Sequence, residues 1–337
     1  METCSSQLKL VTYSDRKRPE DTHAGILWGN SILDARDVGK IAAGLDIKIP
    51  PAIRKLPETP TLLELLARGP RLLDDLRNLS WRVFNRSKPE NKRFLKNVET
   101  VRLHAPIPRP PTLRDFYAFE DHVRTARAKR GQEIPPEWYE FPAFYYSNPT
   151  VVYGPEDNVP NPGYTEMLDF ELEVACVVGK AGKNIPEAKA ESYILGYTIM
   201  NDWSARDVQA KEMRIGLGPA KAKDFATSLG PWLVTSDELE DRRAGSGLFH
   251  LEMRAKVNGK PLSQGNMDRM HWSFPQMVAR ASQSVQLNPG DVFGSGTVGS
   301  GSILELGEAK QRWLLPGDVV ELEIERLGVL RNRIIQS

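Results

Sequence analysis

The sequence predicts a β-rich α+β protein. Short runs in which apolar and polar residues alternate recur after residue 111, with few helical stretches between them. Such alternation is typical of half-buried strands. Glycine (26) and proline (25) together make 51 of 337 residues, which is about 15% against a usual value near 12%. This excess favours turns and short strands over a bundle of helices.

The length predicts two domains, since single domains run to roughly 100–200 residues. Residues 104–111 read HAPIPRPP, with four prolines within 106–111. Such a segment is stiff and extended and cannot form a central strand or a helix. We therefore place the domain junction there, with a small N-terminal domain over 1–100 and a larger domain over 101–337.

The N-terminal domain is expected to begin with strands. QLKLVTYS (7–14) and AGILWGNSILDAR (24–36) are strand-like, and Gly29-Asn30 lies between two apolar stretches as a hairpin turn does. A helix is predicted over 61–68, capped by Thr59, with Pro60 in its first turn and Gly69-Pro70 at its end. Residues 71–97 start as a helix and become basic and loop-like.

The larger domain is expected to contain mostly strands. Strands are predicted over 168–179, 194–202 and 249–265, where Asn258-Gly259 is a second hairpin signal, and one alternating strand over 318–330 closes the chain. Helices are predicted over 115–130, 187–193, 204–213 and 272–283.

Charge and cysteine content exclude several classes of protein. The net charge is +1, which gives no electrostatic case for nucleic acid or an anionic membrane. Cys4 and Cys176 are too few for a disulfide framework or a four-thiolate metal site. No apolar run reaches 18 residues, and the first residues lack the apolar core of a signal peptide. We expect a soluble, cytoplasmic protein.

Three acidic residues form the strongest chemical signal. Glu171 and Glu173 share one face of a predicted strand, because strand side chains alternate. Asp202 ends the next predicted strand, so neighbouring strands would bring three carboxylates together. Two charges about 4 Å apart repel by roughly 4 kcal/mol at an effective dielectric near 20, so the group needs protons or a cation. With oxygen ligands alone the cation would be Mg²⁺, Mn²⁺ or Ca²⁺.

The commoner interpretation of a Glu-x-Glu strand is a solvated face. Glu321 and Glu323 repeat the same spacing, and we interpret that pair in this ordinary way. The pair at 171 and 173 differs because Asp202 follows in the next strand.

Basic and amide side chains follow Asp202. Ser204 can cap a helix on which Arg206 and Gln209 are three residues apart and share a face. Lys223 lies in a loop fixed by glycine and proline. An ordinary surface helix and a solvated lysine are the alternatives.

The segment DFYAFEDH contains Asp115, Tyr117 and His122 within eight residues. His122 is one of five histidines in the chain. Any single histidine considered by itself is more often structural than catalytic. No two of the histidines have the His-x-x-x-His spacing, which argues against zinc.

The glycines of GSGTVG (294–299) match the GxGxxG fingerprint of dinucleotide-binding folds. SGSILEL follows and is not expected to open a helix, and only 38 residues remain after Gly299 (337 − 299). A dinucleotide-binding βαβ unit does not fit there.

Together these segments resemble a known family. LDFELEVACVVG (168–179), MNDWSARDVQ (200–209) and GPAKAKDF (218–225) are similar to the catalytic core of the fumarylacetoacetate hydrolase family, over roughly 110–330. DFYAFEDH (115–122), PAFYYSNPTVVYGPED (142–157) and GTVGSGSILEL (296–306) resemble further segments of that core.

The resemblance implies a role for each candidate residue. The metal ligands would be Asp115, Glu171, Glu173 and Asp202, holding Mg²⁺, Ca²⁺ or Mn²⁺. The catalytic residues would be His122 as general base, Glu305 orienting it, and Arg206, Gln209 and Lys223 stabilising an oxyanion. The substrate would contact Tyr117, Tyr145, Thr297 and an arginine after His122, which is Arg130 or, as the alternative, Arg127.

The resemblance also implies a fold and an activity. The fold would be a mixed β-sandwich or roll, assembled as a homodimer, with a small N-terminal domain. The activity would be metal-dependent hydrolysis of a C–C bond in a β-diketo acid such as fumarylacetoacetate or an acylpyruvate. The alternatives are metal-dependent decarboxylation or tautomerisation of a keto acid such as oxaloacetate, or a metabolite-binding protein without turnover.

Overall fold

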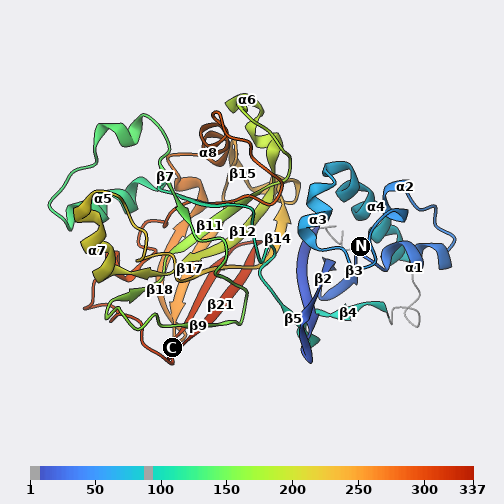
Figure 1. The fold of residues 1–337 in the computed structure, drawn as a ribbon, viewed down its shortest axis with the longest axis horizontal. Helices are drawn as coiled ribbons and strands as arrows, with labels where there is room; N and C mark the ends of the chain where they lie inside the picture. Colours follow the sequence, from blue (N-terminus) through green and yellow to red (C-terminus); the bar gives the residue numbers. More distant parts are fainter. Residues whose placement is uncertain (1–7, 87–93) are drawn as a thin grey trace.

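The computed structural model describes residues 8–86 and 94–337, and Figure 1 shows them as two lobes. We call residues 8–103 the N-terminal lobe and residues 104–337 the C-terminal lobe. Three parts of the sequence predictions lie outside the described residues. They are Cys4, residue 7 at the start of the strand expected over 7–14, and part of the basic stretch after residue 86.

A long mixed sheet runs through both lobes. Within the described residues it has twelve strands, ten of them in the order β4-β3-β2-β1-β14-β12-β11-β19-β6-β7, with β5 paired to β1 and β8 to β14. The strands are β1 (Lys9–Asp15), β2 (Arg18–Trp28), β3 (Ser31–Asp34), β4 (Lys96–Asn97), β5 (Val101–Leu103), β6 (Leu113–Phe116), β7 (Phe144–Ser147), β8 (Val152–Tyr153), β11 (Leu172–Val178), β12 (Ile194–Asp202), β14 (Thr227–Thr235) and β19 (Val292–Gly294). The antiparallel pair β1–β14 joins the lobes, with Lys9 opposite Val234.

The C-terminal lobe adds smaller sheets. A five-stranded sheet runs β18-β17-β20-β21-β9 among the described residues. Its strands are β9 (Asn158–Pro160), β17 (Glu252–Val257), β18 (Lys260–Asn266), β20 (Val319–Ile324) and β21 (Gly328–Ile335). Two short pairs complete the set, β10 (Leu168–Asp169) with β13 (Ser204–Ala205) and β15 (Arg243–Gly245) with β16 (Leu248–Phe249). The predicted β-rich α+β class is confirmed.

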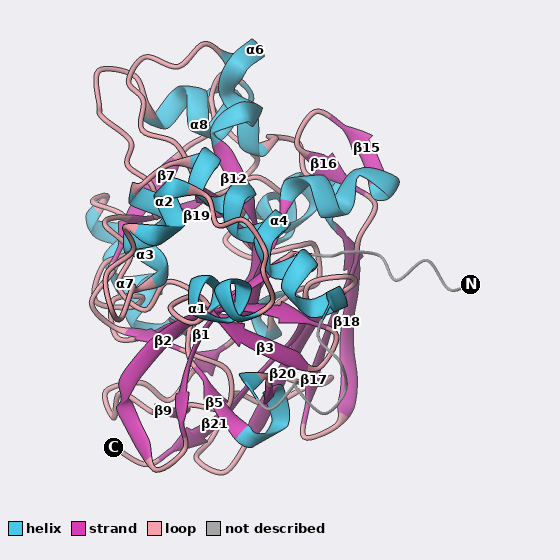
Figure 2. Ribbon diagram, turned by 90° about the vertical axis from the view of Figure 1, so that its right-hand side faces the viewer, coloured by secondary structure: helices cyan, strands magenta, loops and turns pink. Residues whose placement is uncertain are grey.

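The helices divide between the lobes. In Figure 2, where the N-terminal lobe faces the viewer, its helices gather in front of the strands. They are α1 (Val38–Gly44), α2 (Pro51–Arg54), α3 (Leu62–Ala67) and α4 (Pro70–Arg86). The C-terminal lobe has α5 (Glu120–Ala128), α6 (Glu187–Ala190), α7 (Arg206–Ile215), α8 (Phe274–Ala281) and α9 (Ile303–Leu306). Among the described residues, no helix combines the length and apolar character needed to span a membrane.

Strand β11 is buried on both faces, and this fixes its register. Val174 and Cys176 belong to the core that includes the five-stranded sheet, whereas Ala175 and Val177 pack with the N-terminal helices. A slip of one residue would turn every side chain of the strand to the opposite face, so this double burial specifies where Glu173 points.

Several element predictions are confirmed. The hairpin turns at Gly29-Asn30 and Asn258-Gly259 connect β2 to β3 and β17 to β18. Strand β12 has the bounds expected from the sequence, and α6 and α8 lie within the predicted 187–193 and 272–283. The helix predicted over 204–213 is found at Arg206–Ile215, as α7.

Several local predictions are wrong. The cap of α3 is Thr61, whose side chain forms a capping box with Glu64, so Thr59 and Pro60 precede the helix. The end of the chain forms a hairpin of β20 and β21 where one strand was expected. Residue 115 lies in β6 and the helix begins only at Glu120, because the apolar alternation of LRDF continues the sheet. SGSILEL does open a helical turn, α9, with Ser302 as its cap.

Candidate metal centre

Four carboxylates from three strands converge in the C-terminal lobe. Asp115 lies on β6, Glu173 on β11 and Asp202 at the end of β12, while Glu171 lies directly before β11. We call these four residues the acid cluster. One oxygen of each lies within 4.8 Å of the others, and all four side chains are buried. The convergence predicted for Glu171, Glu173 and Asp202 is confirmed, and Asp115 joins them.

Strand order explains the convergence. Strands β11 and β12 are antiparallel neighbours, with Glu173 opposite Met200, so the acids at their adjoining ends meet. Strand β19 separates β11 from β6 and places Gly294 opposite Asp115. A side chain at Gly294 would put Cβ 2.6 Å from Asp115 Oδ1, so only glycine lets that carboxylate reach the cluster.

The acid cluster has strongly shifted pKa values. Burial and the nearby carboxylate of Asp202 raise the pKa of Asp115 well above its ordinary value. Burial, together with the charges of Asp115 and Glu171, does the same to the pKa of Glu173. Burial would also raise the pKa of Glu171, but Lys223 and Arg206 hold it well below the ordinary value.

Lys223 enters the acid cluster. Its Nζ contacts a Glu171 oxygen and lies 2.5 Å from Asp202 Oδ2, so a basic side chain occupies part of the space between the acids. Lys223 does not provide a hydrogen bond to every oxygen of the acid cluster. Glu173 Oε1 and Asp202 Oδ1 remain buried with no hydrogen-bond partner among the described residues. Buried carboxylate oxygens without a donor are costly.

This donor set fits a divalent cation. The ligand atoms would be oxygens alone, which suits Mg²⁺, Mn²⁺ or Ca²⁺. The two unpartnered oxygens and the spacing of the cluster are what a cation site requires, so the residues present are able to hold one.

A buried imidazole lies close enough to the acid cluster to influence Glu171 electrostatically. His122 is on α5 and its Nδ1 lies 2.8 Å from Glu305 Oε2. Glu305, in α9, also accepts hydrogen bonds from the backbone N–H of Ser300 (3.0 Å) and the hydroxyl of Ser302 (3.2 Å). With Nδ1 facing the carboxylate, Nε2 is the nitrogen left to exchange a proton with other groups. The structure thus brings together the predicted His–Glu pair.

Arg206 and Gln209 lie on one face of α7, as expected. Arg206 donates from Nη1 to Gln209 Oε1 (3.0 Å) and from Nη2 to Glu171 Oε1 (2.7 Å). The predicted cap is wrong: the helix begins after Ala205 without a side-chain cap, because the Ser204 hydroxyl donates to the Asp202 carbonyl at 3.0 Å.

The residues expected to bind substrate lie in different surroundings. Tyr117 packs edge-on against His122, with ring centroids 5.5 Å apart. Tyr145 donates its hydroxyl to Asp202 Oδ2 at 2.5 Å and so contacts the acid cluster directly. Thr297 is buried in the loop before α9, whereas Arg130 is exposed and donates to the Ala126 carbonyl.

Two polar groups of the site were missed from the sequence. The backbone N–H of Gly296 donates to Asp115 Oδ1 and Glu173 Oε2, both at 3.1 Å. Asp169, the first acid of LDFELE, forms an ion pair with Arg206 at 2.8 Å. Neither was singled out, because a backbone donor leaves no sequence signal and the partners of Asp169 lie far away in the sequence, at Arg206 and at the backbone of residues 303–304.

The sequence profile described as fumarylacetoacetate (FAA) hydrolase C-terminal matches residues 112–335, which include every residue of the acid cluster and the His122–Glu305 pair. The chain belongs to the fumarylacetoacetate hydrolase family. The N-terminal lobe lies outside the matched region.

Different relatives in this family are named for different reactions. Oxaloacetate tautomerase YisK of Bacillus subtilis (strain 168) is 30% identical over 280 residues, covering 81% of this chain and 86% of that protein. Fumarylacetoacetase of Caenorhabditis elegans is 29% identical, covering 93% and 90%. A solved fumarylacetoacetate hydrolase of Exiguobacterium antarcticum shares the fold with a TM-score of 0.68 at 22% identity, covering 98% and 100%. Family membership therefore supports an enzyme but leaves the reaction open.

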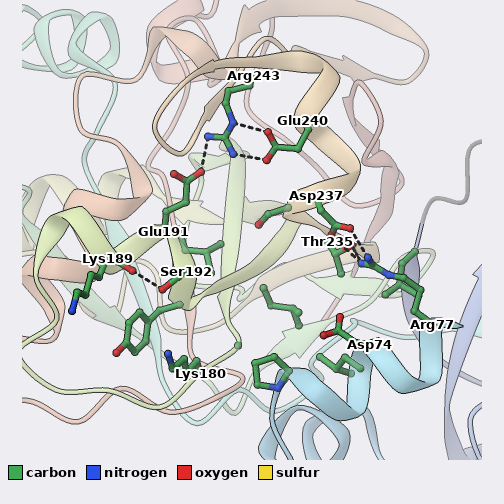
Figure 3. Close-up of a pocket in the computed structure, with 18 of the residues that line it drawn as sticks. Asp74, Arg77, Lys180, Lys189, Glu191, Ser192, Thr235, Asp237, Glu240 and Arg243 are labelled. Atoms are coloured by element: carbon green, nitrogen blue, oxygen red, sulfur yellow. Dashed lines mark hydrogen bonds and ion pairs between the residues drawn. The ribbon is translucent and has the colours of Figure 1, made fainter.

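A second polar region lies between the lobes. Figure 3 shows this interlobe groove, a cavity of about 690 Å³ lined by α4 and by residues near the ends of β12 and β14. Arg77 bonds both carboxylate oxygens of Asp237, at 2.5 and 2.9 Å. Arg243 pairs with Glu240 and Glu191. The charges of Arg77 and Arg243 are therefore balanced by protein carboxylates.

Proposed function

We propose that the protein is a divalent-metal-dependent hydrolase that cleaves a C–C bond in a β-diketo acid, such as fumarylacetoacetate or an acylpyruvate. The observation that carries the proposal is the juxtaposition of the all-oxygen acid cluster and the buried His122–Glu305 pair. The first would hold Mg²⁺, Mn²⁺ or Ca²⁺, and the second would activate water.

The chain's own residues would supply most of the chemistry. When bound, a divalent cation supplies Lewis acidity that favours negative charge on the substrate oxygens. His122 takes a proton from water as the water oxygen adds to a substrate carbonyl carbon, and Glu305 stabilises the imidazolium that results. The C–C bond then breaks, its electron pair leaves as an enolate, and the enolate takes a proton to become the ketone product.

Basic and phenolic side chains would handle charge and orientation. Lys223 and Arg206 are held beside Glu171 and can stabilise the negative charge that forms on the attacked carbonyl, while Gln209 holds Arg206. We assign Tyr117, Tyr145 and Thr297 to substrate contact. Arg130, which lies two residues after α5, would pair with a distal carboxylate.

The test is a metal-supplemented screen. The metal-stripped protein is mixed with acylpyruvates and with fumarylacetoacetate, with and without Mg²⁺ or Mn²⁺, and loss of diketone absorbance is followed. We expect turnover only with metal, with one acid and one keto acid as products. Metal-independent turnover, or none with any diketo acid, contradicts the proposal.

A second candidate is tautomerisation or decarboxylation of a keto acid. It is favoured by the relatives named oxaloacetate tautomerase, at 30% and 31% identity. The same site could serve it, since His122 can move a proton to or from carbon without adding water. Oxaloacetate in the same screen, followed by enol absorbance and by CO₂ release, separates the two reactions from C–C hydrolysis. The homodimer and the cytoplasmic location stay predictions.

A further inference from the structure

Asp169 links two parts of the site that are far apart in the sequence. It lies at the end of β10, it is fully buried, and none of the roles above includes it. We propose that Asp169 is a positioning residue that holds Arg206 and the Glu305 turn in place together, so that the oxyanion-stabilising group and the water-activating pair keep a fixed geometry. The proposal rests on the proposed function for its catalytic consequence.

The first half of the link is the arginine. Asp169 Oδ2 accepts a hydrogen bond from Arg206 Nε at 2.8 Å, while Arg206 Nη2 donates to Glu171 at 2.7 Å. The guanidinium is therefore held on two edges by two buried carboxylates. A planar guanidinium fixed in this way has little rotational freedom left, so its remaining nitrogen keeps one direction.

The second half of the link is the turn that carries Glu305. Asp169 Oδ1 accepts from the backbone N–H of Ile303 at 2.8 Å, and Oδ2 accepts from that of Leu304 at 3.0 Å. These are the first two residues of α9, and Glu305 follows them directly. Glu305 in turn contacts His122 Nδ1 at 2.8 Å.

Only an ionised carboxylate meets all of these demands. Asp169 accepts four hydrogen bonds, two at each oxygen, the fourth coming from its neighbour Phe170 N–H at 2.8 Å. A carboxylate has about four lone-pair positions, so each is used. An asparagine would turn an N–H₂ group toward N–H donors and would leave buried donors unpaired.

The loss expected in Asp169→Asn is therefore catalytic geometry and not metal binding. The acid cluster does not include Asp169, so affinity for Mn²⁺ should stay within about threefold of the unmodified chain. The kcat should fall by about 10–100-fold, as is typical when a group that orients a site residue is replaced, with KM nearly unchanged. Amide exchange over residues 300–306 should become faster.

Asp318→Asn is the matched control. Asp318 is also buried and also binds an arginine and a backbone N–H, namely Arg312 at 2.6 Å and Leu315 N–H at 2.8 Å, but neither partner belongs to the acid cluster or to the His122–Glu305 pair. We expect it to lower the melting temperature by a similar amount and to leave kcat and exchange over 300–306 unchanged.

Each outcome decides something. A kcat for Asp169→Asn within about twofold of the unmodified chain, or a drop that Asp318→Asn shares, overturns the proposal. If Asp169→Asn does not fold, Asp169→Glu keeps the charge but displaces the oxygens, and an unchanged kcat there overturns it equally. Amide exchange needs no substrate. A chain that hydrolyses nothing therefore refutes the proposed function, while unchanged exchange over 300–306 in Asp169→Asn refutes the link itself.

Discussion

The acid cluster and the interlobe groove are built from the same kinds of charged side chain but differ in burial and in balance. The acid cluster is buried, and its carboxylates outnumber the cations that reach them. In the interlobe groove Arg77 and Asp237 remain 27% and 52% exposed and are paired to each other.

The difference teaches which charged group indicates a ligand. Exposed pairs keep their hydration and gain little from each other, so they need no further explanation. Buried carboxylates with unpartnered oxygens raise the free energy of the folded chain unless a proton or a cation joins them. By this criterion the acid cluster, although smaller than the groove, is the place where a ligand is required.

The strongest test of this contrast removes one acid of the cluster. Glu173→Ala should lower affinity for Mn²⁺ by more than about 100-fold and abolish turnover, because a ligand oxygen is lost. Titration calorimetry measures the first effect and a diketo acid assay the second. Glu323→Ala is the control, since it belongs to the similarly spaced pair on β20 and is partly exposed. Equal metal affinity in both variants would contradict the assignment.

A second test separates metal binding from water activation. His122→Ala should lower kcat by about 10²–10⁴-fold, the usual contribution of a general base, while the affinity for metal stays near that of the unmodified chain. The imidazole lies against Glu305 and is not one of the four clustered acids. An unchanged kcat would identify another base, and a parallel loss of metal affinity would place His122 among the ligands.

The third test uses pH. Burial and like charges raise the pKa of both Asp115 and Glu173, so in the metal-free protein these groups hold protons at pH values where exposed acids are ionised. A cation binds the ionised form, so metal affinity should rise with pH and binding should release protons. We expect roughly tenfold tighter binding per pH unit while one proton is displaced. Calorimetry in two buffers of different ionisation enthalpy counts the protons, and no release would contradict the shifts.

The smallest effect is expected in the interlobe groove. Arg77→Ala should reduce the free energy of unfolding by about 1 kcal/mol or less and leave kcat unchanged, because its partner Asp237 stays hydrated when the arginine is lost. Chemical denaturation and the diketo acid assay measure the two quantities. A large loss of activity would mean that this groove also serves the reaction.

Local signals in the sequence predicted much of the fold. Asn258-Gly259 and Gly29-Asn30 mark hairpins through short-range turn geometry, and Glu171 and Glu173 follow from strand alternation. The placement of Asp115 on a strand did not follow, because that strand is defined by its partner β19, which lies some 180 residues later in the chain.

The functional site was predictable only where residues belong to a recognisable local pattern or to a segment that resembles the family. Family resemblance supplied His122 and Glu305, which no spacing rule connects. Asp169 escaped because its role depends on Arg206 and on a turn around residue 303 that the sequence was not expected to form. The position of Lys223 between two acids is likewise a result of packing, since a loop lysine is usually solvated.

The pairing of β1 with β14 has a consequence for any attempt to shorten the chain. Region 112–335 carries the family match, yet β14 would lose a backbone partner without residues 8–103, and Leu229 and Leu233 would lose apolar neighbours in the N-terminal helices. An unpaired edge strand next to exposed leucines would promote association between copies of the shortened chain. A unit expected to fold without such self-association therefore includes more of the chain than the matched residues 112–335.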